Sequence, residues 1–247
     1  MRTFALQLYT VRHALARDPE GTLRGVCEAG YRAVETAPLP PEIPVRRMGE
    51  LLRSFGLTVT AAHADLPLGE CRSEVLHTLA ELGATRLIWH GWPRDPECAS
   101  LEGFRRLADR YTEAAAVAKA NGLSFGLHNH WWEYEPLEEV LPYRFLHDTL
   151  PPEIFFELDV YWVRTAGKDP VDIVRELGPR ITMLHLKDGP AVHGQPMTAL
   201  GQGEVDIPAI LRATDPGVTG VVELDECATD PLEAARESLR FLLAQDD

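Results

Sequence analysis

The stretch of sequence that decides the fold is LSFGLHNHWWE, residues 123–133. Its first five residues form a short apolar run, which predicts a buried strand. Two imidazoles, an amide, two indoles and a carboxylate follow within the next six residues. A buried imidazole or carboxylate destabilises a fold unless it has a partner. The cluster at 128–133 therefore indicates a functional site at the end of this strand.

Three later segments carry the same kind of cluster: ELD at 157–159, HLKD at 185–188 and ELD at 223–225. In both ELD segments the acids are two residues apart, so their side chains point to the same side of a strand. Carboxylates placed in this way repel each other unless a cation or a base lies between them. Too few arginines accompany these acids to neutralise them. We therefore expect four strand ends to converge on one divalent metal ion.

Runs that predict strands recur along the whole chain, at 3–8, 31–36, 57–62, 85–89, 124–127, 154–158, 181–186 and 217–224. Strands that alternate with helices form a parallel sheet, and eight such units in about 250 residues are typical of a closed (β/α)8 barrel. An open doubly wound sheet is the alternative, but its G-x-G-x-x-G turn does not follow the first strand. The sequence therefore predicts an α/β protein with a single TIM barrel domain over 1–247.

Helix boundaries are marked by capping residues. Five helices are expected to begin after an acidic or hydroxyl side chain that caps the first turn; these residues are Asp18, Ser100, Asp169, Asp206 and Asp230. Further helices are expected at 45–55, at 70–82 and within 137–148. A long polar loop should follow the seventh strand. Its G-x-G at 201–203 either offers backbone N–H groups to an anion or only shapes the loop.

Composition disfavours several classes of protein. The chain has 247 residues, and its 38 acidic and 24 basic residues give a net charge of −14. Nucleic-acid binders usually carry a basic surface, so we expect no nucleic-acid partner. Four cysteines without a C-x-x-C pair fit a reducing compartment. The N-terminus makes a poor signal peptide, and no apolar run approaches the roughly 20 residues of a membrane helix. We therefore expect a cytoplasmic protein with no membrane partner.

The active site of such a barrel lies at the carboxyl ends of its strands. Nearly every predicted strand ends in polar residues, several of which alternate with apolar ones. This alternation favours a shared pocket over solvated loops. The candidates are Gln7, Glu35, His63, His90, His128, His130, Glu133, Glu157, Asp159, His185, Lys187, Glu223 and Asp225.

Many of these residues belong to motifs that follow one another in order. The motifs are QLYTVR at 7–12, HNHxxE at 128–133, LDxxW at 158–162, AGxDP at 166–170, HLKD at 185–188, GxGxxD at 201–206 and VE at 222–223. In this order the chain resembles, over essentially its whole length, the sugar phosphate isomerase/epimerase family of xylose isomerase-like barrels. The resemblance implies a small-molecule carbohydrate substrate and suggests a homodimer.

The resemblance also implies one divalent metal ion, held by two glutamates, an aspartate and a histidine. Matched motif by motif, the ligands are Glu133, Asp159, His185 and Glu223. Because Glu133 lies beyond the strand, His128 or His130 is an alternative to it. A mixed oxygen and nitrogen site suits Mn²⁺, while Mg²⁺, Co²⁺ and Zn²⁺ stay open.

The mechanism that the resemblance implies is proton transfer beside a carbonyl through a cis-enediolate. Glu133 and Glu223 are the expected acid and base. Lys187 either polarises the carbonyl or neutralises Glu157 or Asp188. The residues expected to contact the substrate or support the site are Gln7, Glu35, His63, His90, His128, His130, Trp162 and Asp225.

One position departs from several relatives, which carry a histidine three residues after the metal aspartate. This chain has Trp162 there. Together with the acidic charge, the departure argues against endonuclease-like DNA repair and puts a simple ketose epimerase in question. Two alternatives to an isomerase or epimerase therefore stay open. One is a metal-dependent lyase or dehydratase of the inosose dehydratase or 3-keto-glycoside type, and the other is a non-catalytic sugar-binding barrel.

Overall fold

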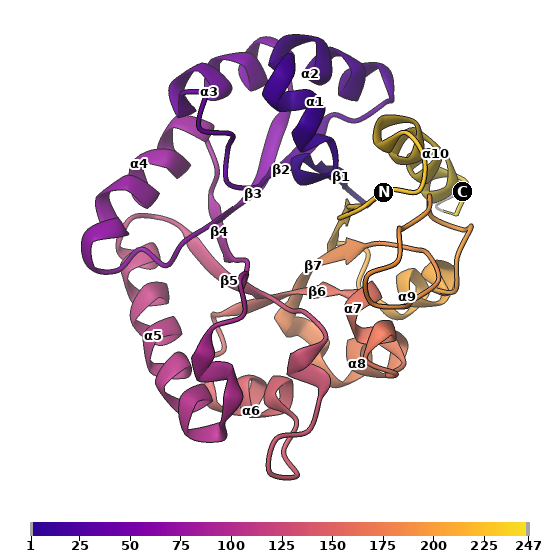
Figure 1. Ribbon diagram of the computed structural model, residues 1–247. Coiled ribbons are helices and arrows are strands. Elements are labelled where there is room, and N and C mark those ends of the chain that lie inside the picture. Colours follow the sequence, from indigo (N-terminus) through magenta and orange to yellow (C-terminus); the bar gives the residue numbers. More distant parts are fainter. Residues whose placement is uncertain (1, 246–247) are drawn as a thin grey trace.

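A computed structural model describes residues 2–245 as a closed barrel of eight parallel strands with helices around it (Figure 1). The strands follow one another in chain order, and the last pairs with the first. They are β1 (Phe4–Gln7), β2 (Ala33–Thr36), β3 (Thr58–Ala64), β4 (Arg86–Trp89), β5 (Ser124–His128), β6 (Phe155–Asp159), β7 (Ile181–Leu186) and β8 (Thr219–Val222). The predicted (β/α)8 barrel is confirmed.

The observed strands lie on the predicted ones and differ only at their ends. β3 continues to Ala64, beyond the expected end, because His63 and Ala64 still pair with β4. β8 starts later than expected because the N–H groups of Gly217 and Val218 donate to Asp215 in a turn, at 2.7 and 3.0 Å. The order and direction of the strands are unaffected.

Helices form the outer layer of the barrel. Within residues 2–245 the α-helices are α1 (Arg12–Arg17), α2 (Pro19–Glu28), α3 (Val45–Ser54), α4 (Arg72–Leu82), α5 (Leu101–Ala120), α6 (Pro142–Thr149), α7 (Val160–Thr165), α8 (Pro170–Leu177), α9 (Ile207–Ala213) and α10 (Pro231–Leu243). All five predicted N-cap side chains accept a hydrogen bond from a backbone N–H of the first turn. None of the described helices is long and apolar enough to span a membrane.

The short helices α1 and α7 are not among the expected ones. α7 begins directly after β6 because Asp159, the last residue of that strand, is its N-cap and accepts from the Trp162 N–H at 2.9 Å. Asn129 fixes the same residue from the side, since its Oδ1 accepts from the Asp159 N–H at 2.9 Å. A predicted metal ligand therefore stands at a rigid strand–helix junction.

The centre of the barrel is filled by one residue from each of seven strands. These form a separate apolar cluster: Ala5, Ala33, Ala61, Ile88, Phe155, Met183 and Val221. Side chains two residues apart along a strand share a face. Two residues after each member of the cluster stands a polar residue, and these are Gln7, Glu35, His63, His90, Glu157, His185 and Glu223. The polar residues therefore form the next layer, at the carboxyl end of the barrel.

The remaining strand, β5, contributes Gly126 at the level of the apolar cluster. A Cβ atom there would lie 2.3 Å from the Phe155 ring, closer than any real contact. The missing side chain thus makes room for Phe155 to fill the barrel centre. His128 stands two residues after Gly126 and joins the polar layer.

The long loop between β7 and α9 is organised around the buried carboxylate of Asp188. Its Oδ1 accepts from the N–H groups of Gly189 and Val205, at 2.8 and 3.1 Å. Its Oδ2 accepts from Gly201 and Gly203, at 2.9 and 3.1 Å. The N–H groups of the predicted G-x-G are therefore bound to a carboxylate of the chain itself.

We expect Asp188→Asn to destabilise the protein. An asparagine side chain presents an NH2 group to two of the four backbone donors, which are then buried without an acceptor. Such losses remove about 2–5 kcal/mol from the free energy of unfolding. Urea unfolding followed by circular dichroism measures the change.

Asp206→Asn is the matched control, because Asn caps α9 as well as Asp and should change stability by less than about 0.5 kcal/mol. Equal stabilities of the two variants would mean that the Asp188 carboxylate does not hold the loop.

Candidate active site

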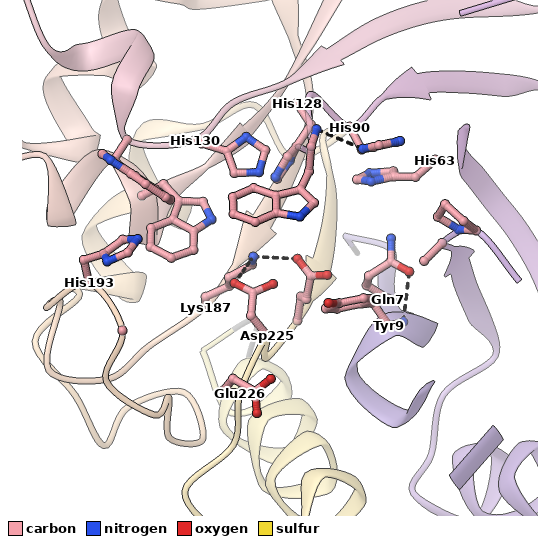
Figure 2. Close-up of a pocket in the computed structure, with 17 residues that line it drawn as sticks. Gln7, Tyr9, His63, His90, His128, His130, Lys187, His193, Asp225 and Glu226 are labelled. Carbon is pink, nitrogen blue, oxygen red and sulfur yellow. Dashed lines mark hydrogen bonds and ion pairs between the residues drawn. The ribbon is translucent and has the colours of Figure 1, made fainter. Parts of the chain in front are cut away.

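A cavity of about 440 Å³ opens at the carboxyl ends of the strands (Figure 2). Nine predicted site residues line it, namely Gln7, His63, His90, His128, His130, Trp162, Lys187, Glu223 and Asp225. Three others, Glu35, Asp159 and His185, are fully buried and contact lining residues. The structure thus brings together every predicted site residue except Glu133.

The buried ammonium group of Lys187 lies among three carboxylates. Its Nζ is 3.0 Å from Asp159 Oδ2, 2.6 Å from Glu223 Oε2 and 2.8 Å from Asp225 Oδ2. Figure 2 shows Lys187 and Asp225 in the middle of the cavity floor. The chain therefore supplies a cation of its own for the acids at the ends of β6 and β8.

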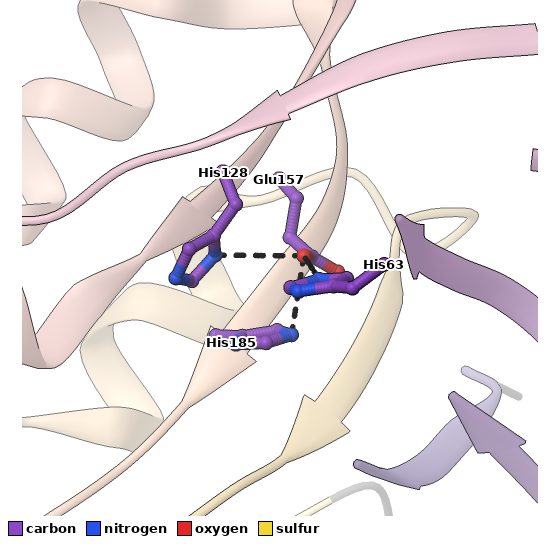
Figure 3. Close-up of side chains that lie close together, drawn as sticks. All are labelled: His63, His128, Glu157 and His185. Carbon is purple, nitrogen blue, oxygen red and sulfur yellow. Dashed lines mark hydrogen bonds and ion pairs between the residues drawn. The ribbon is translucent and has the colours of Figure 1, made fainter. Parts of the chain in front are cut away.

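Glu157, which the sequence offered as a partner of Lys187, lies among three imidazoles instead (Figure 3). Its Oε2 is 2.7 Å from His63 Nε2, 3.1 Å from His185 Nε2 and 3.5 Å from His128 Nδ1. All four side chains are buried. This group was not foreseen as a unit, although each member ends a predicted strand.

His185 connects the group around Glu157 with the group around Lys187 through its two ring nitrogens. Its Nε2 lies 2.6 Å from Glu35 Oε2, which also accepts from Gln7 Nε2 at 2.7 Å. Its Nδ1 lies 2.8 Å from Glu223 Oε2, which in turn contacts Lys187. One connected network therefore runs from β1 around to the end of β8.

Neighbouring groups decide which of the imidazoles are charged. Burial lowers the pKa of His63, but Glu35 and Glu157 outweigh it and raise the pKa to about 9. Burial likewise opposes the charged form of His185, yet Glu157 and the other acids hold its pKa well above the ordinary value. Burial, reinforced by His185, holds the pKa of His128 well below it. Neutral and charged imidazoles thus lie side by side.

The pKa values of the two carboxyl groups after β8 are also shifted in opposite directions. Burial would raise the pKa of Glu223, but Lys187 and His185 outweigh it and hold that pKa well below its usual range. For Asp225 burial prevails over Lys187 and raises the pKa to about 6. Two carboxyl groups that contact the same ammonium group therefore differ in how readily they bind a proton.

The donor atoms of Asp159, His185 and Glu223 fit a divalent cation. One atom from each lies within 4.8 Å of the others, and all three residues are buried. Asp159 Oδ2 and His185 Nδ1 approach charged partners but make no aligned hydrogen bond. Such a carboxylate and imidazole set can hold Mn²⁺ or a related ion. The group around Glu157 satisfies the same distance condition.

Glu133 is in neither group. Its Oε2 accepts from the backbone N–H of His130 at 3.0 Å, and it lines a small separate cavity together with Tyr111 and Tyr134. Burial outweighs the His130 N–H and raises the pKa of Glu133 to about 7. The carboxylate thus holds the loop after β5 and lies apart from the other predicted metal ligands.

Aromatic side chains from loops form one wall of the cavity. The rings of Trp131 and His193 are 4.2 Å apart, and those of Trp131 and Trp162 are 5.0 Å apart. Trp92 also lines the cavity, and its backbone N–H donates to His90 Nδ1 at 3.0 Å. Burial lowers the pKa of His90 to about 4, so its ring is neutral. His193 was missed because nothing in its polar loop marks it as a site residue.

Comparisons place the chain among known barrels. Residues 23–245 match the family model described as xylose isomerase-like TIM barrel. No curated protein matches the sequence. A sugar phosphate isomerase/epimerase from Parabacteroides distasonis superposes with a TM-score of 0.82 at 21% identity, over 98% of each chain.

Two further solved structures are similar. L-ribulose 3-epimerase gives a TM-score of 0.74 at 18% identity, over 99% of this chain and 94% of that one. The probable 3-DHS dehydratase AsbF from Bacillus anthracis gives 0.76 at 14% identity, over 98% and 99%. At these identities the likeness of the structures shows the fold alone.

We expect the stability conferred by Glu133 to depend on pH. Because its folded pKa of about 7 exceeds the ordinary 4.5, the folded state binds this proton more tightly than the unfolded state. Stability is therefore lost as the pH rises from about 4.5 through about 7. Glu133→Gln removes the titration, so its stability relative to wild type should improve by up to about 3 kcal/mol over that range.

Denaturant unfolding between pH 4.5 and 8 measures this difference. The control is Glu135→Gln, the same change at an exposed position of the same loop. A pH profile of Glu133→Gln that coincides with that of Glu135→Gln would contradict the expectation.

Proposed function

The chain belongs to the xylose isomerase-like TIM barrel family, and we propose that it is a divalent-metal-dependent isomerase or epimerase of a sugar or keto-polyol. The observation that carries the proposal is the cavity floor. It combines three buried metal-capable side chains with a lysine and two acids of different proton affinity. Such a set of groups can catalyse proton transfer beside a carbonyl.

The residues that would hold the ion are Asp159, His185 and Glu223. Among the alternatives to Glu133, His128 is favoured as a further ligand because its Nε2 lies 3.7 Å from Asp159 Oδ2. When bound, the ion would supply Lewis acidity to adjacent oxygens of the substrate. The group around Glu157 satisfies the same distance condition, and the motif match is what favours Asp159, His185 and Glu223 over it.

Glu223 and Asp225 are our candidates for moving the proton. Glu223 is ionised and lines the cavity, so it can accept a proton from carbon. Asp225, with its pKa raised by burial to about 6, can return one near neutral pH. Lys187 contacts both acids and lines the cavity, where its ammonium group would stabilise charge on the carbonyl oxygen. Asp225 thus takes the part that the sequence suggested for Glu133.

A lyase or dehydratase is the second candidate, and Asp225 favours it. Elimination of water needs an acid that protonates the leaving hydroxyl after the proton on carbon has been removed. A carboxyl group with a pKa of about 6, beside the ionised Glu223, is suited to that step.

We expect about one Mn, Co, Zn or Mg ion per chain in protein purified without a histidine tag. Asp159→Asn and Glu223→Gln should lose the ion, because each removes a charged ligand. Glu133→Gln should retain it and serves as the control. Inductively coupled plasma mass spectrometry gives the metal content.

Wild-type protein that contains no metal, and that no divalent ion stabilises against heat, would refute a metal site. Loss of the ion in Glu133→Gln alone would return Glu133 to the ligand set.

Product masses separate the two candidate reactions. Incubation of the metal-loaded protein with a panel of ketoses and keto-polyols should convert one of them to a product of unchanged mass. A product lighter by one water would establish the dehydratase instead. Glu223→Gln is the negative control, since it should abolish either reaction. Unchanged turnover in that variant would exclude Glu223 as the base.

A further inference from the structure

The turn that follows β4 fixes the ring of His90. Its Nδ1 accepts a hydrogen bond from the backbone N–H of Trp92 at 3.0 Å. Gly91 between them has a φ of +69°, a left-handed conformation that glycine adopts without strain. Because a backbone N–H can only donate, Nδ1 must be the unprotonated nitrogen. The proton of the neutral ring is therefore on Nε2.

Two features keep this ring uncharged. Burial, reinforced by the charge of His63, lowers the pKa of His90 to about 4. A second proton would have to go to Nδ1, where it would break the hydrogen bond from Trp92. His90 lines the cavity and thus offers it one N–H donor without a positive charge.

The carboxylate of Asp65 lies next to this donor. Asp65 directly follows β3, it is exposed, and its Oδ1 is 4.0 Å from His90 Nε2. This separation is too long for a direct hydrogen bond, but two hydrogen bonds of about 2.8 Å can span it through one oxygen atom. A hydroxyl group between them would accept from His90 and donate to Asp65. The pair therefore matches the donor and acceptor capacity of a single hydroxyl group.

His90 stands across the barrel from the proposed base. Three strands separate β4 from β8 in either direction around the barrel, and Figure 2 shows His90 apart from Lys187 and Asp225. The ring of His90 is 6.4 Å from that of His63, which is 5.2 Å from that of His185. His185 Nδ1 in turn contacts Glu223 Oε2. A sugar that reacts beside Glu223 would therefore have its remote end near His90.

This remote end is unsuited to a phosphate group. Among the described residues that line the cavity, Lys187 is the one lysine or arginine, and three carboxylates surround its ammonium group. The N–H groups of the G-x-G after β7 bind a carboxylate of the chain itself. A phosphate beside His90 would meet the carboxylate of Asp65, which repels it.

We propose that His90 and Asp65 form a subsite for one hydroxyl group of the substrate, at the end remote from its reacting carbonyl. The Nε2–H group of His90 donates to the hydroxyl oxygen, and the hydroxyl group donates to Asp65. The subsite selects a sugar with a free terminal hydroxyl group over its deoxy and phosphorylated forms. The proposal rests on the proposed function for the position of the carbonyl, and it adds two residues that determine specificity.

Nitrogen-15 NMR tests the donor without a substrate. Two-bond ¹H–¹⁵N spectra of the Mg²⁺-loaded protein at pH 7 should show His90 with a protonated Nε2 and an unprotonated Nδ1. His90→Asn identifies the signals, because it lacks this ring. The Asn oxygen can still accept from the backbone N–H of Trp92, while nothing replaces Nε2. A His90 ring with its proton on Nδ1 would overturn the proposal.

Calorimetric titration tests the hydroxyl group with probes that keep the carbonyl. The probes are the ketopentoses and ketohexoses with Mn²⁺, each beside its terminal deoxy analogue and its terminal phosphate. The ketose that binds most tightly should bind roughly 10-fold more tightly than its deoxy analogue, which leaves both groups of the subsite unpaired. Its phosphate should bind more weakly than the free ketose, because Asp65 repels it.

Asp65→Ala should weaken binding of that ketose roughly 10-fold and leave the affinity for the deoxy analogue unchanged, so that the preference disappears. His90→Asn should have the same effect. Because Asp65 is exposed, its truncation should not disturb folding, which circular dichroism verifies. Glu70→Ala is the control, because it removes another exposed acid from the segment between β3 and α4 and should keep the full preference.

Four calorimetric results would also contradict the subsite: equal affinity of the wild type for a ketose and its deoxy analogue, tighter binding of the phosphate, an undiminished preference in Asp65→Ala, or no binding of any ketose. Neither measurement needs turnover. The expected preference without any reaction would therefore reject the proposed function and keep the subsite, whereas turnover of a ketose and its deoxy analogue with equal affinity would do the reverse.

Discussion

The buried ammonium group of Lys187 is the interaction on which the candidate site depends. Carboxylates from the end of β6 and the segment after β8 reach it within 3.0 Å, at the bottom of the cavity. Without it, Asp159 and Glu223 would be buried like charges beside Asp225, which is strongly destabilising. His185 extends the network by contacting Glu223 on one side and Glu157 on the other. A divalent ion would therefore join a floor whose geometry the chain already fixes.

The barrel makes this density of charge possible by separating two layers. Residues such as Met183 and Val221 fill the centre, and His185 and Glu223 follow two positions later on the same faces. The apolar layer holds the strands in register, and this fixes the distances between the side chains of the polar layer above it. Phe155 can complete the apolar layer only because the neighbouring strand has a glycine opposite its ring. Packing below the site thus determines the electrostatics within it.

Local rules made the strands, the helix caps and most strand-end residues predictable from the sequence. Which side chain contacts which in the site was not predictable, because these contacts depend on strand register and on loop conformation. The HNHxxE motif pointed Glu133 at a metal, yet its carboxylate accepts from the His130 N–H and holds the loop. Of the two alternatives left open for the G-x-G after β7, the structure supports loop shaping, because its N–H groups bind Asp188 of the same chain. In both cases the residue type was informative and the contact was set by tertiary structure.

The floor and the wall of the cavity come from different parts of the fold. Similarity to other barrels therefore says more about the floor than about the wall. Floor residues such as His185 stand on strands, whose positions the barrel fixes. Wall residues such as Trp92, Trp131 and His193 stand on loops, which vary most among barrels of one fold. Structures with 14–21% identity can therefore share the strand framework and differ in substrate. Selectivity in this chain must then be argued from its own loops, where aromatic rings and a filled anion site replace free positive charge.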